Sequence, residues 1–178
     1  MTNVFFISDL HFGHKRITSF QGVPEALQRR GGDYIENMHI IISNWNNVVS
    51  KRDLVWVLGD IAFSQEGFDA LSELNGRKKM VRGNHDNYFT TEQWLQHFET
   101  VEGLTRYKGY WLSHCPIHPL ELRGKKNIHG HQHHNLIRNS YTQEWDCNYI
   151  NVCVEWAEHT PVSFDLIKNG EYNKRFID

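Results

Sequence analysis

Apolar runs of strand length recur through the first half of the chain. Residues 4–8 and 54–58 are continuous apolar stretches, and each predicts a buried β-strand because it is too short for a buried helix. Residues 79–81 predict a third strand, which leads into a polar turn. Each of the three runs ends abruptly in Asp, Asn or His.

Helical patterns separate these runs. Apolar residues between positions 35 and 49 recur at steps of three and four, which is typical of one face of an amphipathic helix, and Asp33 stands where an N-cap is expected. Residues 68–74 predict a shorter helix that ends at Gly76. The first half therefore has the order βαβαβ.

The second half changes character after a predicted helix at 92–98. Strand-like pieces follow, and helical spacing is largely absent among them. These pieces are residues 104–107, 110–113, 127–129, 149–154 and 162–167. Neither a Pro/Gly/Ser linker nor a repeat of fixed period divides the chain, so residues 1–178 are expected to form a single α/β domain with two sheets.

Composition narrows the classes of function. Nineteen Lys and Arg stand against 21 Asp and Glu, so no overall basic field would draw the chain onto nucleic acid, and a nucleotide substrate would have to be recognised locally. No apolar run approaches the roughly 18 residues of a membrane helix. Three Cys, and an N-terminus without the pattern of a signal peptide, predict a cytoplasmic protein without a disulfide framework.

Histidine is over-represented, and its positions are informative. Six of the twelve His fall between residues 114 and 134. Others follow the predicted strands together with carboxylates, and in open α/β sheets ligands lie beyond the carboxyl ends of strands. The candidate metal-binding and catalytic residues at these strand ends are Asp9, His11, Asp60, Asn84, His85, Asp86, His114, His131 and His133.

Each of these residues has an ordinary interpretation when it is taken alone. A Gly-Asp pair is a common turn, and a single His is often a hydrogen-bonded core or surface residue. In an extended segment, however, His131 and His133 lie on one face about 7 Å apart, which suits two neighbouring ions better than one crowded ion. Five such segments in order are hard to produce by chance.

The blocks Asp9-x-His11, Gly59-Asp60, Gly83-Asn84-His85-Asp86, His114 and Gly130-His131-x-His133 resemble the signature of the calcineurin-like metallophosphoesterases. The resemblance extends over nearly the whole chain to a compact bacterial and phage subgroup. It implies a four-layer αββα sandwich of two mixed β-sheets flanked by helices, with a dinuclear metal site at the carboxyl ends of the strands. Cys153 departs from the pattern, since Gly is usual there, and so does Arg16, where a small polar residue is expected.

The resemblance also implies roles for the residues of these blocks. Asp9, His11 and His133 would hold one divalent ion, Asn84, His114 and His131 would hold the other, and Asp60 would bridge both. Oxygen and nitrogen ligands admit Mn²⁺, Fe, Zn²⁺ or Ni²⁺, with Mn²⁺ expected to support activity in vitro. Two such ions would activate a bridging hydroxide for attack on a phosphate ester.

Catalytic and substrate-contacting residues are expected around these ligands. His85 would protonate the leaving oxygen or stabilise the transition state, and Asp86 would hold the ring of His85. His14 and Arg16 are candidate substrate contacts, although a structural hydrogen bond explains His14 equally well. The basic cluster Arg123, Lys125 and Lys126 could steer a phosphate or be a solvated loop.

The predicted function is therefore dinuclear metal-dependent hydrolysis of phosphodiester bonds in a nucleotide-type substrate or nucleic acid. A small domain without an evident cap leaves the site open to long substrates, which favours diesters. The alternatives are a phosphomonoesterase with the same site, a non-catalytic scaffold on this fold, and a structural zinc domain built on Cys115, His118 and the later His pair. The sequence indicates no membrane partner and does not define the oligomeric state.

Overall fold

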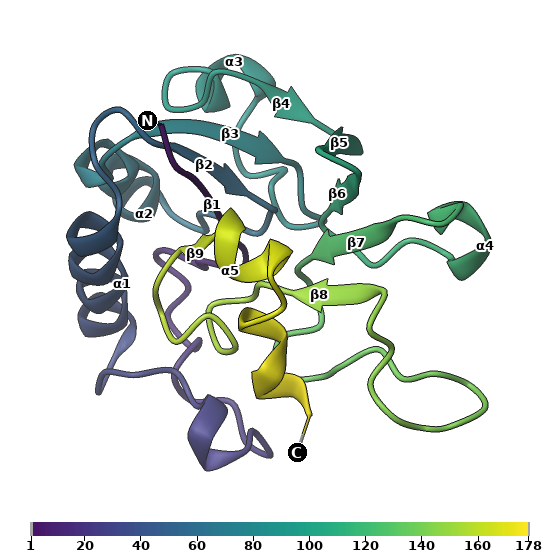
Figure 1. Cartoon of the computed structure of the whole chain (residues 1–178). Coiled ribbons are helices and arrows are strands. Elements are labelled where there is room, and N and C mark those ends of the chain that lie inside the picture. The colour runs from purple at the N-terminus through teal and green to yellow at the C-terminus, as the bar shows by residue number, and fades with distance from the viewer. Residues whose placement is uncertain (1, 178) are drawn as a thin grey trace.

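The first sheet carries three of the predicted strands at its centre. The computed structural model describes residues 2–177 (Figure 1). The strands in spatial order are β4 (Val101–Glu102), β3 (Arg77–Val81), β2 (Leu54–Val57), β1 (Val4–Ile7) and β9 (Val162–Ser163). All neighbours are parallel except β9, which runs antiparallel to β1. The predicted central strands are confirmed to within one or two residues.

The second sheet is built from the later strand-like pieces. Its order is β5 (Thr105–Tyr107), β6 (Tyr110–Ser113), β7 (Lys126–His129) and β8 (Tyr149–Asn151). Strands β6, β7 and β8 are parallel, and β5 is antiparallel to β6. Both sheets are therefore mixed, and each brings several carboxyl ends of parallel strands to one edge.

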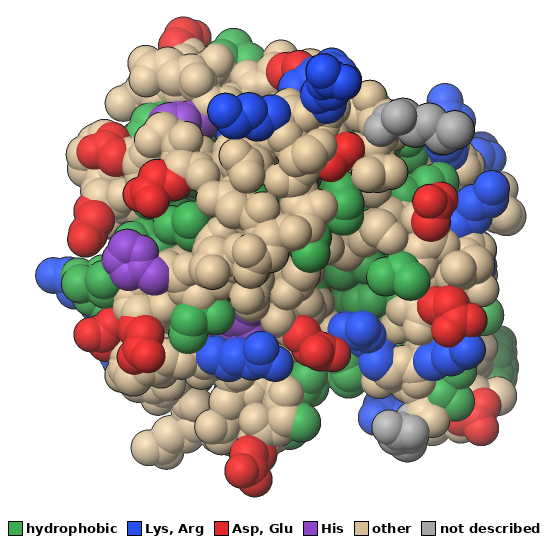
Figure 2. Space-filling model, turned by 60° about the vertical axis from the view of Figure 1, so that its left-hand side comes forward, with side chains coloured by type: hydrophobic (Ala, Val, Ile, Leu, Met, Phe, Trp, Pro, Cys, Tyr) green, Lys and Arg blue, Asp and Glu red, His purple; other side chains and the backbone are tan. Residues whose placement is uncertain are grey.

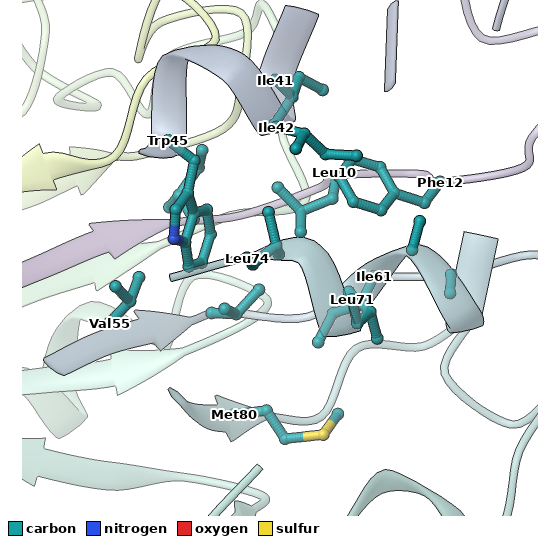
Figure 3. Packing of buried hydrophobic residues seen from close by; sticks show 14 of the residues in the cluster. Leu10, Phe12, Ile41, Ile42, Trp45, Val55, Ile61, Leu71, Leu74 and Met80 are labelled. Atoms are coloured by element: carbon teal, nitrogen blue, oxygen red, sulfur yellow. The ribbon is translucent and has the colours of Figure 1, made fainter. Parts of the chain in front are cut away.

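Helix α1 (Tyr34–Val48) covers one face of the first sheet. The carboxylate of Asp33 accepts hydrogen bonds from the N–H groups of Ile35 and Glu36, so the predicted N-cap is confirmed. Figure 3 shows Ile41, Ile42 and Trp45 of α1 directed toward Leu10, Phe12 and the side chains of the sheet. This apolar contact fixes the loop that follows β1.

The predicted second helix begins earlier than its apolar pattern suggests. It is α2 (Gln65–Asp69), capped by the Ser64 hydroxyl, which continues into the 3₁₀ helix η2 (Ala70–Glu73). Leu71 and Leu74 join the core beneath α1 (Figure 3).

A second apolar cluster lies between the two sheets. Phe6 and Trp56 of the first sheet pack there with Ile128 and Ile150 of the second. Helix α5 (Phe164–Lys168) and the 3₁₀ helix η3 (Tyr172–Phe176) add Phe164, Ile167, Tyr172 and Phe176 to this cluster. The C-terminal segment thus contributes to the core that joins the sheets.

Three predicted elements differ in the structure, and one of them is the strand predicted at 149–154, which ends at Asn151 as β8. The strand predicted at 162–167 is only the two-residue β9, after which the Ser163 hydroxyl caps α5 by accepting from the N–H of Leu166. The helix predicted at 92–98 is the single turn α3 (Thr91–Trp94). Short elements that the pattern did not indicate are β4, η3, η1 (Glu25–Leu27) and α4 (Pro119–Leu122).

The two sheets meet at the carboxyl end of β1. The N–H of Ser8 donates to the carbonyl of Val152, and the N–H of Val154 donates to the carbonyl of Ser8, so β1 is tied to the segment after β8. The predicted α/β fold of two mixed sheets flanked by helices is confirmed. Within residues 2–177, no helix has both the length and the apolar character needed to cross a membrane.

Candidate metal centre

The predicted ligands gather where the strands of both sheets end. Asp9 and His11 follow β1, Asp60 follows β2, and Asn84 follows β3; His114, His131 and His133 follow β6 and β7 of the second sheet. Five of these residues adopt positive φ, from 47° to 69°, a region that Asp and His enter more readily than most side chains. These residues are Asp9, His11, Asp60, His131 and His133.

The first group of ligand atoms surrounds one carboxylate oxygen. Oδ1 of Asp9 lies 3.8 Å from Nε2 of His11 and 3.7 Å from Nε2 of His133. Oδ1 of Asp9 and both ring nitrogens of His11 are buried without a hydrogen-bond partner among the described residues. Ligand atoms about 2.1 Å from a shared ion lie roughly 3.4 Å apart in a tetrahedral site, so these atoms fit a divalent ion. An ion would also satisfy polar atoms that are otherwise costly to bury.

The second group surrounds Nε2 of His114. This atom lies 2.9 Å from Oδ1 of Asn84, 3.2 Å from Nδ1 of His131 and 3.4 Å from Oδ2 of Asp60. Oδ2 of Asp60 also lies 3.8 Å from Nε2 of His11 in the first group. Asp60 therefore stands between the two groups, at the position that a bridging carboxylate requires.

The other oxygen of Asp9 is held by the protein. Oδ2 accepts hydrogen bonds from the Ser8 hydroxyl at 2.6 Å, the N–H of His131 at 2.9 Å and the Cys153 thiol at 3.1 Å. A Cβ at Gly130 would collide with Ser8 Oγ and with this oxygen, so only glycine fits there. The carboxylate is thereby oriented with Oδ1 toward the histidines.

The electrostatics of the site favour ionised carboxylates. Burial opposes ionisation of Asp9, but the neighbouring charges of His114 and His133 outweigh it and hold the pKa of Asp9 well below the usual value. Burial lowers the pKa of His11 to about 4, so its ring is neutral and can bind an ion through a lone pair. Burial also lowers the pKa of His114, but Asp60 and Asp9 raise it to about 9. Binding of an ion at His114 would therefore release a proton.

A buried ion pair that the sequence did not reveal supports His133. Oε1 of Glu155 lies 3.0 Å from Nδ1 of His133 and accepts from Nε of Arg29 at 2.9 Å. The guanidinium of Arg29 also donates to the carbonyls of Asp9 and Leu10. A carboxylate behind a ligating imidazole fixes its tautomer and its orientation. Only the three-dimensional contact identifies Arg29, because it lies 126 positions from Glu155 in the sequence.

His85 and Asp86 have different surroundings. His85 is exposed at the rim of the site, where its ring packs 5.4 Å from the ring of Phe63. The expectation that Asp86 holds the ring of His85 is wrong: its two oxygens accept from the backbone N–H groups of Asp60, Ile61 and Gly83. Asp86 is fully buried, and it orders the loops after β2 and β3 rather than the imidazole.

The candidate substrate contacts lie on the loop after β1. The ring of half-buried His14 stands 5.5 Å from the ring of His11, and its Nδ1 is buried without a partner among the described residues. Arg16 is exposed two residues further on. The basic cluster lies elsewhere, because Lys126 begins β7 and the ligands follow the opposite end of that strand. Arg123 there pairs with Glu121 in an exposed salt bridge.

Two further residues near the ligands have defined positions. Of the residues named for the structural zinc alternative, Cys115 offers a sulfur atom close to the ring nitrogens of His114 and His131. His118 caps α4 by accepting from the N–H of Leu120, so it does not join a ligand group.

Comparisons with known proteins show the family and the fold of this chain. A model of the calcineurin-like phosphoesterases matches residues 2–171. An uncharacterised protein of Methanocaldococcus jannaschii is similar, with 34% identity covering 94% of this chain and 90% of that protein. The gene 66 protein of Mycobacterium phage L5 shares 30% identity, covering 77% and 80%, respectively. The crystal structure of a protein of unknown function from Aquifex aeolicus has the same fold, with a TM-score of 0.65 and 24% identity, covering 95% of this chain and 99% of that one.

This chain belongs to the calcineurin-like phosphoesterase family. Membership supports metal-dependent phosphoester hydrolysis, and the family implies the use of two divalent ions. The clustered ligand atoms described above fit that requirement.

Proposed function

We propose that this protein hydrolyses phosphodiesters of the nucleotide type at two divalent ions. One observation carries the proposal: the unpartnered Oδ1 of Asp9 faces His11 and His133, while Asp60 stands between that group and His114. When bound, the two ions would supply an activated water for in-line attack and neutralise the phosphoryl oxygens. Asp9, His11 and His133 would hold one ion, Asn84, His114 and His131 the other, and Asp60 would bridge them.

We assign protonation of the leaving oxygen to His85. Its ring is exposed beside the ligands and is not part of either ligand group, so it is free to approach a substrate. An imidazolium there donates a proton to the leaving oxygen as the P–O bond breaks. The rings of His14 and His85 both pack against the ring of Phe63, and His14 is proposed to contact the substrate phosphate together with Arg16.

A diester substrate is favoured by the open rim of the site. Asn84 and His85 are both exposed, and no additional domain covers them within residues 2–177. A substrate with groups on both sides of the phosphorus can therefore extend away from the ions in two directions.

The test compares two chromogenic esters in the presence of Mn²⁺. We expect bis(p-nitrophenyl) phosphate to be hydrolysed with a higher kcat/KM than p-nitrophenyl phosphate, and Asp60→Asn to abolish both reactions. The metal content, measured by plasma mass spectrometry, should be close to two ions per chain. A higher kcat/KM for the monoester would make the protein a phosphomonoesterase. Inactivity of the loaded protein with Mn²⁺, Fe, Zn²⁺ and Ni²⁺ would favour a scaffold.

A cytoplasmic location stays a prediction.

A further inference from the structure

A cleft of about 560 Å³ opens beside the metal centre. One wall is the segment 17–29, which follows β1, and the other is the segment 131–135, which follows β7. His131 and His133 line the cleft, so one end of it is formed by proposed metal ligands. A phosphate held at the ions would therefore place its organic substituent within reach of this cleft.

The cleft offers an aromatic surface. Phe20 lines it and is 52% exposed, although a side chain of this size is usually buried. The ring of Phe20 lies 5.9 Å from the ring of His14, so it continues the row of rings that begins at His11. An exposed ring on the wall of a cleft favours a flat partner that can stack on it.

Amides are the most numerous polar side chains of the cleft: Gln21, Gln28, Gln132 and Asn135 line it beside three His, two hydroxyl and two charged residues. The amide of Gln28 donates to the carbonyl of Val23, whereas those of Gln21, Gln132 and Asn135 take part in no hydrogen bond within residues 2–177. Each such amide can both donate and accept. The charged residues on the wall, Arg29 and Glu155, already pair with each other at 2.9 Å. The cleft therefore suits a neutral group whose edge carries both donors and acceptors.

We propose that this cleft binds the nucleobase of a nucleotide ester, with the base stacked on Phe20 and its edge facing the amides of Gln21, Gln132 and Asn135. A phosphate alone would leave most of the cleft empty, whereas ligand clefts of about 300–1,000 Å³ accommodate groups of nucleoside size. The inference rests on the proposed function, because the phosphate of the same ligand is held at the two ions. The inference adds to that function a set of side chains that would select substrates by their base.

The test measures binding without turnover. Two phosphonates are used, in which CH₂ replaces the ester oxygen: the analogue of adenosine 5′-monophosphate and the analogue of ribose 5-phosphate, which lacks the base. They are titrated by calorimetry into the Mn²⁺-loaded protein. We expect the adenosine analogue to bind about tenfold more tightly, because stacking of its base on an aromatic ring contributes to the binding free energy.

Two variants test whether the difference in affinity between the two phosphonates depends on Phe20. Phe20→Ala should reduce the tenfold preference to near unity without changing the affinity for the ribose analogue. Tyr141→Ala is the matched control, because Tyr141 is 94% exposed and does not line the cleft. Equal binding of the two phosphonates by the wild type, or a preference that survives Phe20→Ala, would overturn the proposal.

The outcome is separable from that of the proposed function. A preference for the adenosine analogue that depends on Phe20, in a protein that hydrolyses no ester, would support the cleft and reject the hydrolase. Hydrolysis of bis(p-nitrophenyl) phosphate without any preference for the base would reject the cleft alone.

Discussion

At the scale of single residues, the protein separates groups that hold ions from a group that can reach the substrate. The proposed ligands His11 and His114 are buried, whereas His85 is exposed and belongs to neither ligand group. Replacement of His85 should therefore affect the chemical step without affecting ion binding. This difference can be measured.

We expect His85→Ala to lower kcat for bis(p-nitrophenyl) phosphate by about 10²- to 10³-fold, because general acid catalysis contributes a factor of this size. The metal content and the melting temperature should match those of the wild type. His39→Ala, at an exposed position on α1, should leave kcat unchanged. Unchanged turnover in His85→Ala would assign proton donation to another group, and loss of an ion would make His85 a ligand.

The sequence predicts residues of this site to different degrees. Asp9, His11 and Asp60 were identifiable because each follows an apolar run and belongs to a recognisable block. Their left-handed backbone conformations were not, since these depend on contacts such as the bond from the N–H of His11 to the carbonyl of Asp60. The role of Cys153 was equally hidden, because a thiol 144 positions away from Asp9 has no local signal.

At the scale of elements, the pair Arg29–Glu155 joins the segment after β1 to the segment after β8. Both side chains are almost fully buried, and Glu155 also contacts His133. Loss of the carboxylate would leave the Arg29 charge without its partner, which is costly inside a protein. This ion pair should therefore contribute to the stability of the whole fold.

Glu155→Gln is expected to lower the free energy of unfolding at pH 7 by about 3 kcal/mol. Burial raises the pKa of Glu155, but Arg29 and His133 outweigh it and lower the pKa to about 2, from 4.5 in an unfolded chain. Because the pKa is lower in the folded state, this stabilisation is complete above pH 4.5 and is lost as the pH falls toward 2. The difference between variant and wild type, measured by urea unfolding, should therefore shrink across that window.

Glu121→Gln is the control for this experiment. Glu121 pairs with Arg123 in an exposed salt bridge, so its replacement should change the free energy of unfolding by less than about 1 kcal/mol. An equal effect of the two substitutions, or a Glu155→Gln effect that is constant from pH 7 to pH 2, would contradict the assignment.

Elements with strong periodicity were predictable, and those set by tertiary contacts were not. The apolar positions of α1 recur at helical spacing, and Met38, Ile41, Ile42 and Trp45 are buried on one face, so the pattern alone located this helix. Residues 162–167 carry Val, Phe, Leu and Ile, which suit a strand or a buried helix equally. In the structure the strand ends after two residues, because Ser163 caps helix α5. The 3₁₀ helix η3 lacked a recognisable period, although Tyr172 and Phe176 pack into the core.

At the scale of the whole molecule, the charged side chains are dispersed over the surface, whereas the proposed metal ligands are gathered at one edge of the two sheets. Figure 2 shows Lys, Arg, Asp and Glu interspersed on the visible face, in keeping with 19 basic and 21 acidic residues. Attraction of a phosphate ester therefore depends on local groups and bound ions rather than on a broad basic surface. The fold provides this by bringing the strand ends of two sheets to one edge.

The fold of the molecule should persist without its ions. The two apolar clusters contain none of the proposed ligands, and they extend over both sheets and helix α1. Without ions, His114 has a pKa of about 9, so at neutral pH its charge still compensates Asp60 at 3.4 Å. The protein itself thus supplies a cation to the buried carboxylates.

Removal of the ions with EDTA should therefore abolish hydrolysis while the far-UV circular dichroism spectrum is retained. Each ion at 100 times its Kd stabilises a folded chain by about 2.7 kcal/mol, so removal of both corresponds to a fall in Tm of roughly 11–22 °C. Addition of Mn²⁺ should restore both turnover and Tm. A structural zinc domain would instead unfold when its ion is removed. Loss of the dichroism signal in EDTA would thus show that the ions hold the fold together, whereas its retention with loss of turnover would assign them to the chemistry.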